Sequence, residues 1–274
     1  MVIDAHRHFW HYTDSEFGWI DNDAIRRDFL PESCVGMDAC IAVQARQSVE
    51  ETKWLLSLAE RHDFIKGVVG WVPLASPGLP DVLDSLCGDG AHVRRPGGLV
   101  GLRHVVQDEP DDAFILRGDF NRGVREVLSR GFAYDILVFE RHLENVVKFV
   151  DMHSADARFV LDHLGKPHSM EPWRSNLREL AKRENVMCKL SGLVTEIGDR
   201  SDAALFPYLE AALEAFGPGR VMFGSDWPVV TAHMPYSEWR AAVMRFIAPL
   251  SSYEREAVMG GNAAGFYLKA RQRQ

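Results

Sequence analysis

Short runs of apolar residues, rich in valine and isoleucine, recur along the whole chain. They begin roughly 26 to 37 residues apart and are nearly continuous, without a regular alternation of apolar and polar positions. Buried strands of a parallel sheet show this pattern, because both faces of such a sheet are covered. We expect strands at Val2–His8, Ala39–Ala45, Lys66–Leu74, Leu99–Val106, Phe132–Phe139, Arg158–His163, Val186–Leu190 and Val221–Asp226.

Amphipathic stretches lie between most of these runs. In the first of them, 48–62, Ser48 is placed to cap a helix, and Trp54, Leu55 and Leu58 share one face. We expect further helices at Asp119–Arg130, Arg141–Asp151, Pro172–Glu184, Asp202–Phe216 and Ser237–Phe246.

Strand and helix therefore alternate to the end of the chain. Eight strands with helices between them, in 274 residues, predict an α/β fold of the (β/α)8 TIM-barrel type, with residues 1–274 as a single domain. A doubly wound open sheet is the alternative. The 46% of hydrophobic residues is enough for a substantial core.

The charge and cysteine content narrow the class of protein. The net charge is -8 and no block of lysine or arginine occurs, so neither nucleic acid nor an anionic membrane is an expected partner. The four cysteines have no CxxC spacing, which favours reduced thiols. No signal peptide is visible, and no apolar run approaches the roughly 20 residues that span a bilayer. We expect a soluble, cytoplasmic protein; its oligomeric state stays open.

The first strand carries a His-X-His pair. His6 and His8 are two residues apart, so they point to the same side of a strand, and Asp4 shares that parity. Two imidazoles at this spacing can bind one metal ion, and neutral imidazole is a good ligand for zinc. For an isolated His-X-His pair, however, two hydrogen-bonded histidines near a strand end are the commoner explanation.

Polar residues close most of the other apolar runs. In a barrel, the C-terminal ends of the strands meet at one mouth, where reactive groups lie. Burying such residues costs several kcal/mol unless they are paired, so a ring of them predicts a site. They are Gln44 and Arg46, Arg103 and His104, Asp162, His163 and Lys166, Lys189, and Asp226 followed by Trp227. No GxSxG elbow and no glycine-rich phosphate loop occurs, which argues against a serine nucleophile and a nucleotide cofactor.

The order of these motifs resembles a known family. A first strand with His-X-His, then "LDHLGKP", then a late "GSDWP", is similar to the amidohydrolase superfamily in its amidohydrolase-2 branch. The stretches "IAVQARQS", "GLRHVVQDE", "CKLSGLVTE" and "GGNAAGFYL" look closer still to the sugar lactonases, the group of L-fuconolactonases and L-rhamnonolactonases. The resemblance covers essentially the whole chain.

The resemblance implies roles for particular residues. His6, His8 and Asp226 match metal ligands, His163 matches the histidine of the sixth strand, and Asp226 moves the proton of the attacking water. The stretch "FAYDILVF" lacks the histidine that many relatives carry in the fifth strand, and the fourth strand lacks a bridging lysine. A two-metal centre is therefore not expected. One divalent ion, zinc, is implied, and a metal-independent enzyme is the alternative.

The function that this resemblance implies is hydrolysis of a small sugar-derived lactone, such as L-fucono- or L-rhamnonolactone, to the free aldonic acid. Asp226 accepts a proton from water, and a metal ion, or Arg103 and His104, stabilises the carbonyl oxygen. Asp226 or His163 returns a proton to the leaving oxygen. A metal-dependent decarboxylase or a dicarboxylic-lactone (muconolactone-type) hydrolase is the second enzyme hypothesis. A barrel that only binds a sugar acid is the non-catalytic one.

A long loop, His11–Pro31, follows the first strand and is rich in aromatic residues. Exposed aromatic rings are costly, so we expect this loop to fold over the barrel mouth with Trp19 near the ligand. The alternative is a loop whose aromatic rings are buried against the flank of the barrel. The expected substrate-binding residues are Trp19, Gln44, Arg46, Lys189 and Trp227.

Overall fold

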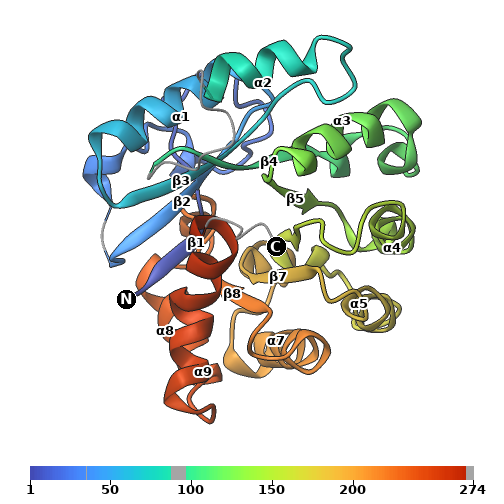
Figure 1. Ribbon diagram of the computed structural model, residues 1–274. Helices are drawn as coiled ribbons and strands as arrows, with labels where there is room; N and C mark the ends of the chain where they lie inside the picture. The colour runs from blue at the N-terminus through green and yellow to red at the C-terminus, as the bar shows by residue number, and fades with distance from the viewer. Residues whose placement is uncertain (35, 88–96, 270–274) are drawn as a thin grey trace.

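Eight parallel strands form the centre of the molecule. The computed structural model describes residues 1–34, 36–87 and 97–269. Consecutive strands are paired in parallel, so the order in the sheet follows the order along the chain. Figure 1 shows the helices arranged around the strands. The predicted (β/α)8 barrel is confirmed, and the chain does not form an open doubly wound sheet.

The first strand is also joined to the segment that follows the last one. An isolated parallel bridge links Arg7 to Trp227. The N–H of Asp226 donates to the carbonyl oxygen of His6 at 2.9 Å, and the N–H of His8 donates to the carbonyl oxygen of Trp227 at 2.7 Å. These hydrogen bonds bring the two ends of the sheet together and give a nearly closed barrel.

The strands lie where the apolar runs predict them, although most are shorter than the runs. Several runs end in polar residues, and these residues lie in the loops beyond the strands. The strands are β1 (Ile3–Arg7), β2 (Ala39–Val43), β3 (Ile65–Gly70), β4 (Leu99–Val105), β5 (Ala133–Leu137), β6 (Phe159–Leu161), β7 (Val186–Leu190) and β8 (Val221–Phe223).

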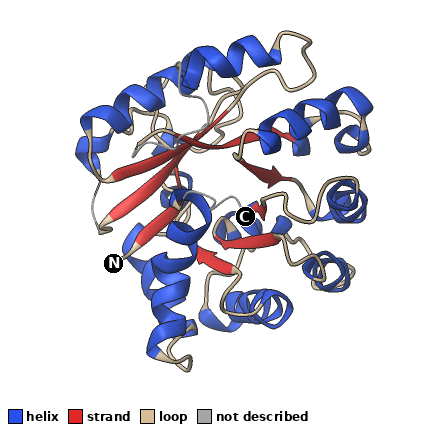
Figure 2. Cartoon of the chain, in the orientation of Figure 1, coloured by secondary structure: helices blue, strands red, loops and turns tan. Residues whose placement is uncertain are grey.

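Helices cover the outside of the barrel, as Figure 2 shows. All six predicted helices are present, with ends that differ by a few residues, and Ser48 caps the first of them by accepting from the N–H of Glu51. The α-helices of the described residues are α1 (Val49–Arg61), α2 (Leu79–Cys87), α3 (Gly118–Ser129), α4 (Leu143–Asp151), α5 (Trp173–Ala181), α6 (Leu193–Glu196), α7 (Asp202–Phe216), α8 (Tyr236–Phe246) and α9 (Ser252–Glu256).

The barrel interior is apolar at the end where the strands begin. Most of the side chains that fill it are small or branched, as is usual inside such barrels. A short turn near the C-terminus, η10 (Ala264–Leu268), adds the ring of Tyr267 to this cluster. The cluster contains Ile3, Ala5, Ala39, Ile41, Val43, Val69, Val100, Ala133, Val160, Met222, Ala263 and Tyr267.

The loop after β1 divides its aromatic residues between two environments. Trp10 and Phe17 are buried, and the indole N–H of Trp10 donates to the carbonyl oxygen of Arg27 at 2.8 Å. Trp19 is 48% exposed, with its ring edge-on to Trp10 at a centroid distance of 5.9 Å. Burial against the barrel therefore accounts for Trp10 and Phe17, and Trp19 is the ring left at the surface.

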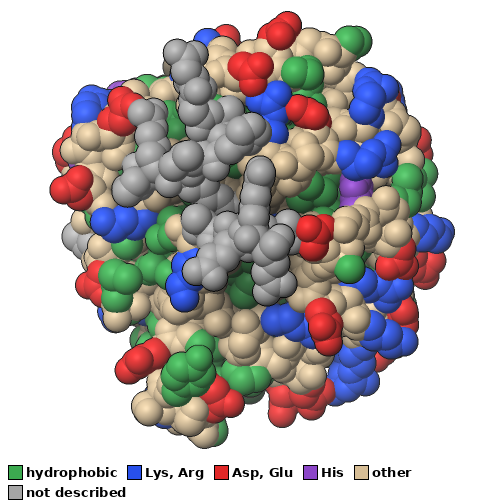
Figure 3. Space-filling model, viewed as in Figure 1, with side chains coloured by type: hydrophobic (Ala, Val, Ile, Leu, Met, Phe, Trp, Pro, Cys, Tyr) green, Lys and Arg blue, Asp and Glu red, His purple; other side chains and the backbone are tan. Residues whose placement is uncertain are grey.

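The surface carries charges of both signs. Acidic and basic side chains are interspersed over the described part of the face in Figure 3. The four cysteines are free thiols. Among the described residues, no helix is both long and apolar enough to span a bilayer.

Candidate active site

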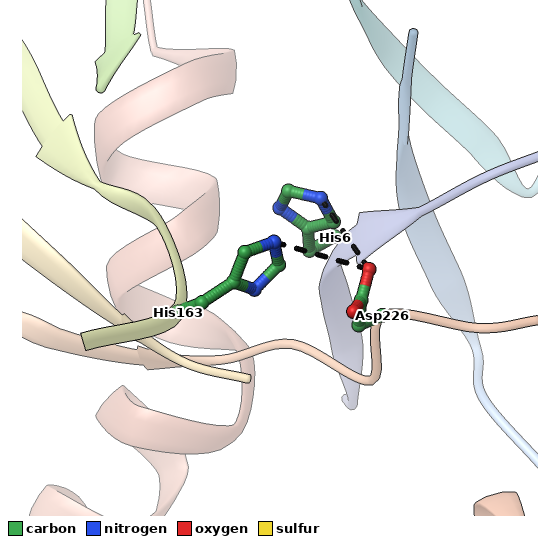
Figure 4. A group of neighbouring side chains, drawn as sticks. All are labelled: His6, His163 and Asp226. Carbon is green, nitrogen blue, oxygen red and sulfur yellow. Dashed lines mark ion pairs between the residues drawn. The ribbon is translucent and has the colours of Figure 1, made fainter. Parts of the chain in front are cut away.

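Three residues from distant parts of the chain converge at the end of the barrel where the strands finish. His6 lies in β1, His163 follows β6, and Asp226 follows β8 (Figure 4). Their ligand-type nitrogen and oxygen atoms all lie within 4.8 Å of one another. His8 joins them, since its Nε2 is 3.2 Å from Oδ1 of Asp226 and 3.2 Å from Nε2 of His6. The His-X-His pair of the first strand therefore faces the aspartate that follows the last one.

An irregularity in β1 explains how both histidines face this point. The pairing of β1 with β2 shifts between Asp4 and Arg7. Ala5 belongs to the interior apolar cluster, yet the next side chain, His6, also points inward. The expected shared parity of Asp4 with the histidines is therefore wrong. Its carboxylate instead accepts from the N–H of Ser225 at 2.8 Å, in the segment that leads to Asp226.

His163 and Asp226 both have left-handed backbone conformations. Their φ angles are 53° and 59°, which is uncommon for residues other than glycine. Such strain persists only where the surroundings hold it, and it is found frequently at functional sites. Gly192, with φ of 64°, packs against His163 so closely that a Cβ would lie 2.6 Å from the ring. Gly192 therefore lets the segment after β7 fix the position of His163.

The Nδ1 atoms of two of the histidines have fixed partners. Nδ1 of His8 lies 2.8 Å from the carbonyl oxygen of Val43, and Nδ1 of His163 lies 2.8 Å from Oγ of Ser191. A carbonyl oxygen only accepts hydrogen bonds, so Nδ1 of His8 carries the proton. When His8 is neutral, the lone pair of its Nε2 then points at Asp226 and His6. Acceptor atoms that face one another in this way suit a bound cation or proton.

The charge states at the site follow from burial and from the neighbouring groups. Burial lowers the pKa of His163 to about 4, and it holds the pKa of His6 well below its ordinary value. Burial alone would raise the pKa of Asp226, but His163, His8 and His6 together bring it below the usual range. At neutral pH the site therefore contains an ionised carboxylate beside two neutral imidazoles.

A buried group of charges lies beneath these residues. Nζ of Lys189 is 2.6 Å from Asp135, 3.0 Å from Asp162 and 3.1 Å from Nδ1 of His6. Arg103 donates to Asp162 at 3.0 Å, and its Nη1 also lies 3.1 Å from Nε2 of His6. His6 is thus flanked by a cation at each of its ring nitrogens.

A cavity of about 610 Å³ opens above the site. Seven of the residues predicted from the sequence line it: His8, Trp19, Arg46, Arg103, His163, Lys166 and Asp226. Lining residues that the sequence analysis did not select include Glu16, Gln47, Asp108, Phe139 and Glu196. Asp226 and His163 thus lie at a surface that a small molecule can reach.

His104, which was expected to help stabilise the carbonyl oxygen, does not line this cavity. Its Nε2 is 2.6 Å from Glu109, and its ring stacks on Phe114 at 5.1 Å. Neighbouring residues in a strand point to opposite faces, so Arg103 and His104 cannot both face the barrel interior. Arg103 takes the inner position, and His104 packs among the rings outside the sheet.

Three expected substrate-binding residues also lie away from the cavity. Gln44 and Lys189 are fully buried inside the barrel, and Trp227 is 6% exposed. The Trp227 ring stacks under the guanidinium of Arg7, 4.3 Å from its carbon, and contacts Phe29 edge-on. None of the three is among the residues that line the cavity.

Two residues that shape the site, Ser191 and Gly192, were not selected from the sequence, and Asp162 was selected without a specific role. Asp162 precedes His163 in the "LDHLGKP" stretch and anchors Arg103 and Lys189. Ser191 and Gly192 follow Lys189 in "CKLSG" and fix His163. A polar or small residue directly after a buried strand is the only signal that points to them, and many loops share it.

Comparison with known proteins finds relatives that match nearly the whole chain. The profile of a protein family described as "Amidohydrolase" matches residues 3–268. An L-fucono-1,5-lactonase from Burkholderia multivorans is 42% identical, over 97% of this chain and 96% of that protein. An L-fucono-1,5-lactonase from Burkholderia ambifaria is 36% identical, over 97% and 94% of the two chains.

A solved structure is similar as well. The crystal structure of an amidohydrolase from Burkholderia multivorans with bound zinc has a TM-score of 0.88 to this chain and is 42% identical to it. The match covers 97% of this chain and 99% of that one.

We expect the buried His163 to make the metal-free protein less stable in acid. Its pKa is about 4 in the folded protein, against about 6.5 for an unfolded chain. Below pH 6.5 the unfolded chain therefore binds a proton that the folded protein does not. This penalty is absent above pH 6.5 and grows to about 3 kcal/mol near pH 4. Urea unfolding at pH 7, 5.5 and 4.5, in the presence of a chelator, measures it.

The variant His163→Gln should lose this part of the pH dependence. The matched control is His11→Gln, since the His11 side chain is 60% exposed. A slope of stability against pH that is the same in His163→Gln and in the wild type would contradict the assignment.

Proposed function

The chain belongs to the amidohydrolase family, and from this premise we propose that it is a hydrolase of cyclic esters that opens a small sugar-derived lactone to the free aldonic acid. The observation that carries the proposal is the ionised Asp226, which lines the cavity among His6, His8 and His163. The two L-fucono-1,5-lactonases make L-fucono-1,5-lactone the first substrate to test. A panel of sugar lactones, with acid release followed by a pH indicator, tests the activity.

The chemistry needs a base, a group that stabilises the oxyanion, and a proton donor. Asp226 takes a proton from a water molecule as that water attacks the lactone carbonyl. The guanidinium of Arg103 lines the cavity and supplies positive charge for the carbonyl oxygen. The ring oxygen leaves as a hydroxyl group, with the proton returned by Asp226. His163, whose Nε2 is 3.9 Å from Oδ1 of Asp226, is the less favourable donor, because its pKa of about 4 leaves it neutral at neutral pH.

A zinc ion fits the donor atoms of the site. We propose His6, His8 and Asp226 as its ligands, with His163 beside them, because these residues offer neutral imidazole nitrogens and a carboxylate. When bound, zinc supplies Lewis-acid polarisation of a carbonyl group and lowers the pKa of water. Arg103 works against binding, since its Nη1 already lies 3.1 Å from Nε2 of His6.

The charges around the cavity disfavour an anionic substrate. A decarboxylase or a dicarboxylic-lactone hydrolase needs cations that are free to bind carboxylates. Here Arg46 is paired with Glu16, Lys166 with Glu196, and Arg103 with Asp162. These pairs favour a neutral, polar ligand over a dicarboxylate. The strained backbone at Asp226 favours a catalytic site over simple binding of a sugar acid.

We also propose a cytoplasmic location, because free thiols are typical of a reducing compartment.

The substitution Asp226→Asn should abolish lactone hydrolysis while the fold is kept. An amide cannot accept the proton of the attacking water, and loss of a general base costs about 10² to 10⁴ in rate. The measurement is kcat/KM on the best lactone of the panel, with circular dichroism as the check on folding. Asp84→Asn, at a side chain that is 62% exposed and pairs with Arg130, is the matched control. A folded Asp226→Asn variant with near-wild-type kcat/KM would sink the assignment.

One zinc ion should bind per chain, and its binding should require His6. Elemental analysis of the purified protein, and calorimetric titration of the chelated protein with zinc, measure the stoichiometry. His6→Gln should lose binding, and His11→Gln should keep it. Zinc bound equally well by His6→Gln would place the ion elsewhere. Full lactone hydrolysis in chelator would assign stabilisation of the oxyanion to Arg103 alone.

Trp19→Ala should raise KM several-fold with little change in stability, because this ring lines the cavity and is half exposed. Trp10→Ala is the contrasting variant in the same loop. Its ring is 1% exposed, so truncation should cost about 3–5 kcal/mol of unfolding free energy. Thermal unfolding and steady-state kinetics separate the two. If Trp19→Ala loses stability while its kinetics hold, the ring does not contact the substrate.

A further inference from the structure

An ion pair in the wall of the cavity has no role in the chemistry described so far. Nζ of Lys166 lies 3.6 Å from Oε1 of Glu196. Both residues line the cavity together with His163 and Asp226. Their side chains are only 17% and 10% exposed, so the pair is largely sheltered from solvent.

The backbone places this pair next to the reacting groups. Lys166 follows His163 by three residues and has a left-handed backbone with φ of 52°. Its Nζ also lies 5.2 Å from the centre of the Phe139 ring. Glu196 ends α6, the short helix that begins directly after Gly192, and Gly192 packs against the His163 ring. The pair is therefore fixed relative to His163 from two sides.

The chemistry of the pair suits two neighbouring hydroxyl groups. A carboxylate accepts from a hydroxyl, and an ammonium group donates to the oxygen of the next one. At 3.6 Å the two charged groups lie beyond ordinary hydrogen-bond distance, so each keeps capacity for a ligand. His168 also lies near Glu196, since its Nδ1 is 4.0 Å away, and its side chain is 57% exposed.

The cavity wall holds a second ion pair, Arg46 with Glu16, and its contacts differ from those of Lys166 and Glu196. Arg46 contacts Glu16 closely, and its guanidinium lies 5.4 Å from the centre of the Phe17 ring. It is also 3.8 Å from the buried carboxylate of Glu51. Arg46 therefore lies between two carboxylates and ties the loop after β1 to the barrel.

We propose that Lys166 and Glu196 determine specificity by binding two adjacent hydroxyl groups of the sugar lactone. The inference rests on the proposed lactonase function and adds to it the residues that distinguish a polyhydroxylated ring from a plain one. A site built to hydrogen-bond hydroxyl groups rejects an analogue that lacks them, because its sheltered polar groups are then left unpaired.

The test uses lactams, which resist hydrolysis, so that binding is measured without turnover. The probes are the 1,5-lactams that correspond to L-fuconic, L-rhamnonic and D-gluconic acid, with 2-piperidone as the ring without hydroxyl groups. Isothermal titration calorimetry gives Kd for the hydroxylated lactams, and NMR titration follows the weaker binding of 2-piperidone. The proteins are the wild type, Lys166→Met and Glu196→Met.

The wild type should bind at least one hydroxylated lactam more than tenfold more tightly than 2-piperidone. Each variant should weaken that binding by about 10- to 100-fold, the loss expected for a hydrogen bond to a charged group. Binding of 2-piperidone should change by less than about twofold. Glu214→Gln, at a carboxylate that pairs with Arg174 and Arg178 away from the cavity, should leave both affinities unchanged.

Equal weakening for hydroxylated lactams and for 2-piperidone would show a general structural role and overturn the proposal. So would a wild type without preference, or variants that keep the preference. Failure of the proposed function is a separate result. In that case the lactams bind as predicted, but the wild-type protein opens none of the corresponding lactones.

Discussion

The charged side chains buried inside the barrel determine the charge and position of the residues at the cavity above them. Two carboxylates, Asp135 and Asp162, share the ammonium group of Lys189, and Arg103 pairs with Asp162 as well. Moving such ions out of water costs several kcal/mol each, so they persist only when they are paired and held in good geometry. The barrel supplies that geometry, because Arg103, Asp135 and Lys189 lie in β4, β5 and β7, and Asp162 directly follows β6. The hydroxyl group of Tyr267 adds a hydrogen bond to Asp135 at 2.7 Å, so the C-terminal turn of the chain supports the same group.

The charge state of His6 follows from this arrangement. With two carboxylates balanced by two cations, the group is neutral without a charge on His6, and burial keeps the His6 pKa low. The ionised Asp226 then adds one negative charge at the floor of the cavity. One uncompensated carboxylate beside neutral imidazoles suits two tasks, accepting a proton from water and holding a divalent cation. The same electrostatic balance therefore suits both the metal-free and the metal-bound form of the proposed chemistry.

Sequence pattern predicts the barrel well, because each strand is a separate apolar run and each helix has its own amphipathic face. It also selects His6, His8, His163 and Asp226, since these residues close runs that end at one mouth. It does not tell how deep a polar residue lies along a strand. Lys189 belongs to the paired group beneath the cavity, although it was expected to contact substrate. The register shift in β1 has no local signature either, so the orientation of Asp4 could not be derived from alternation.

The segment after β7 positions two residues of the cavity wall, His163 and Glu196. Gly192 allows α6 to start so close to His163 that a side chain at this position would collide with the ring. This close approach holds the His163 ring in one orientation, and Oγ of Ser191 contacts its Nδ1. The same helix ends at Glu196, which lines the cavity and pairs there with Lys166. A residue with a Cβ at position 192 would therefore displace His163 and Glu196 together, because one turn of backbone positions both.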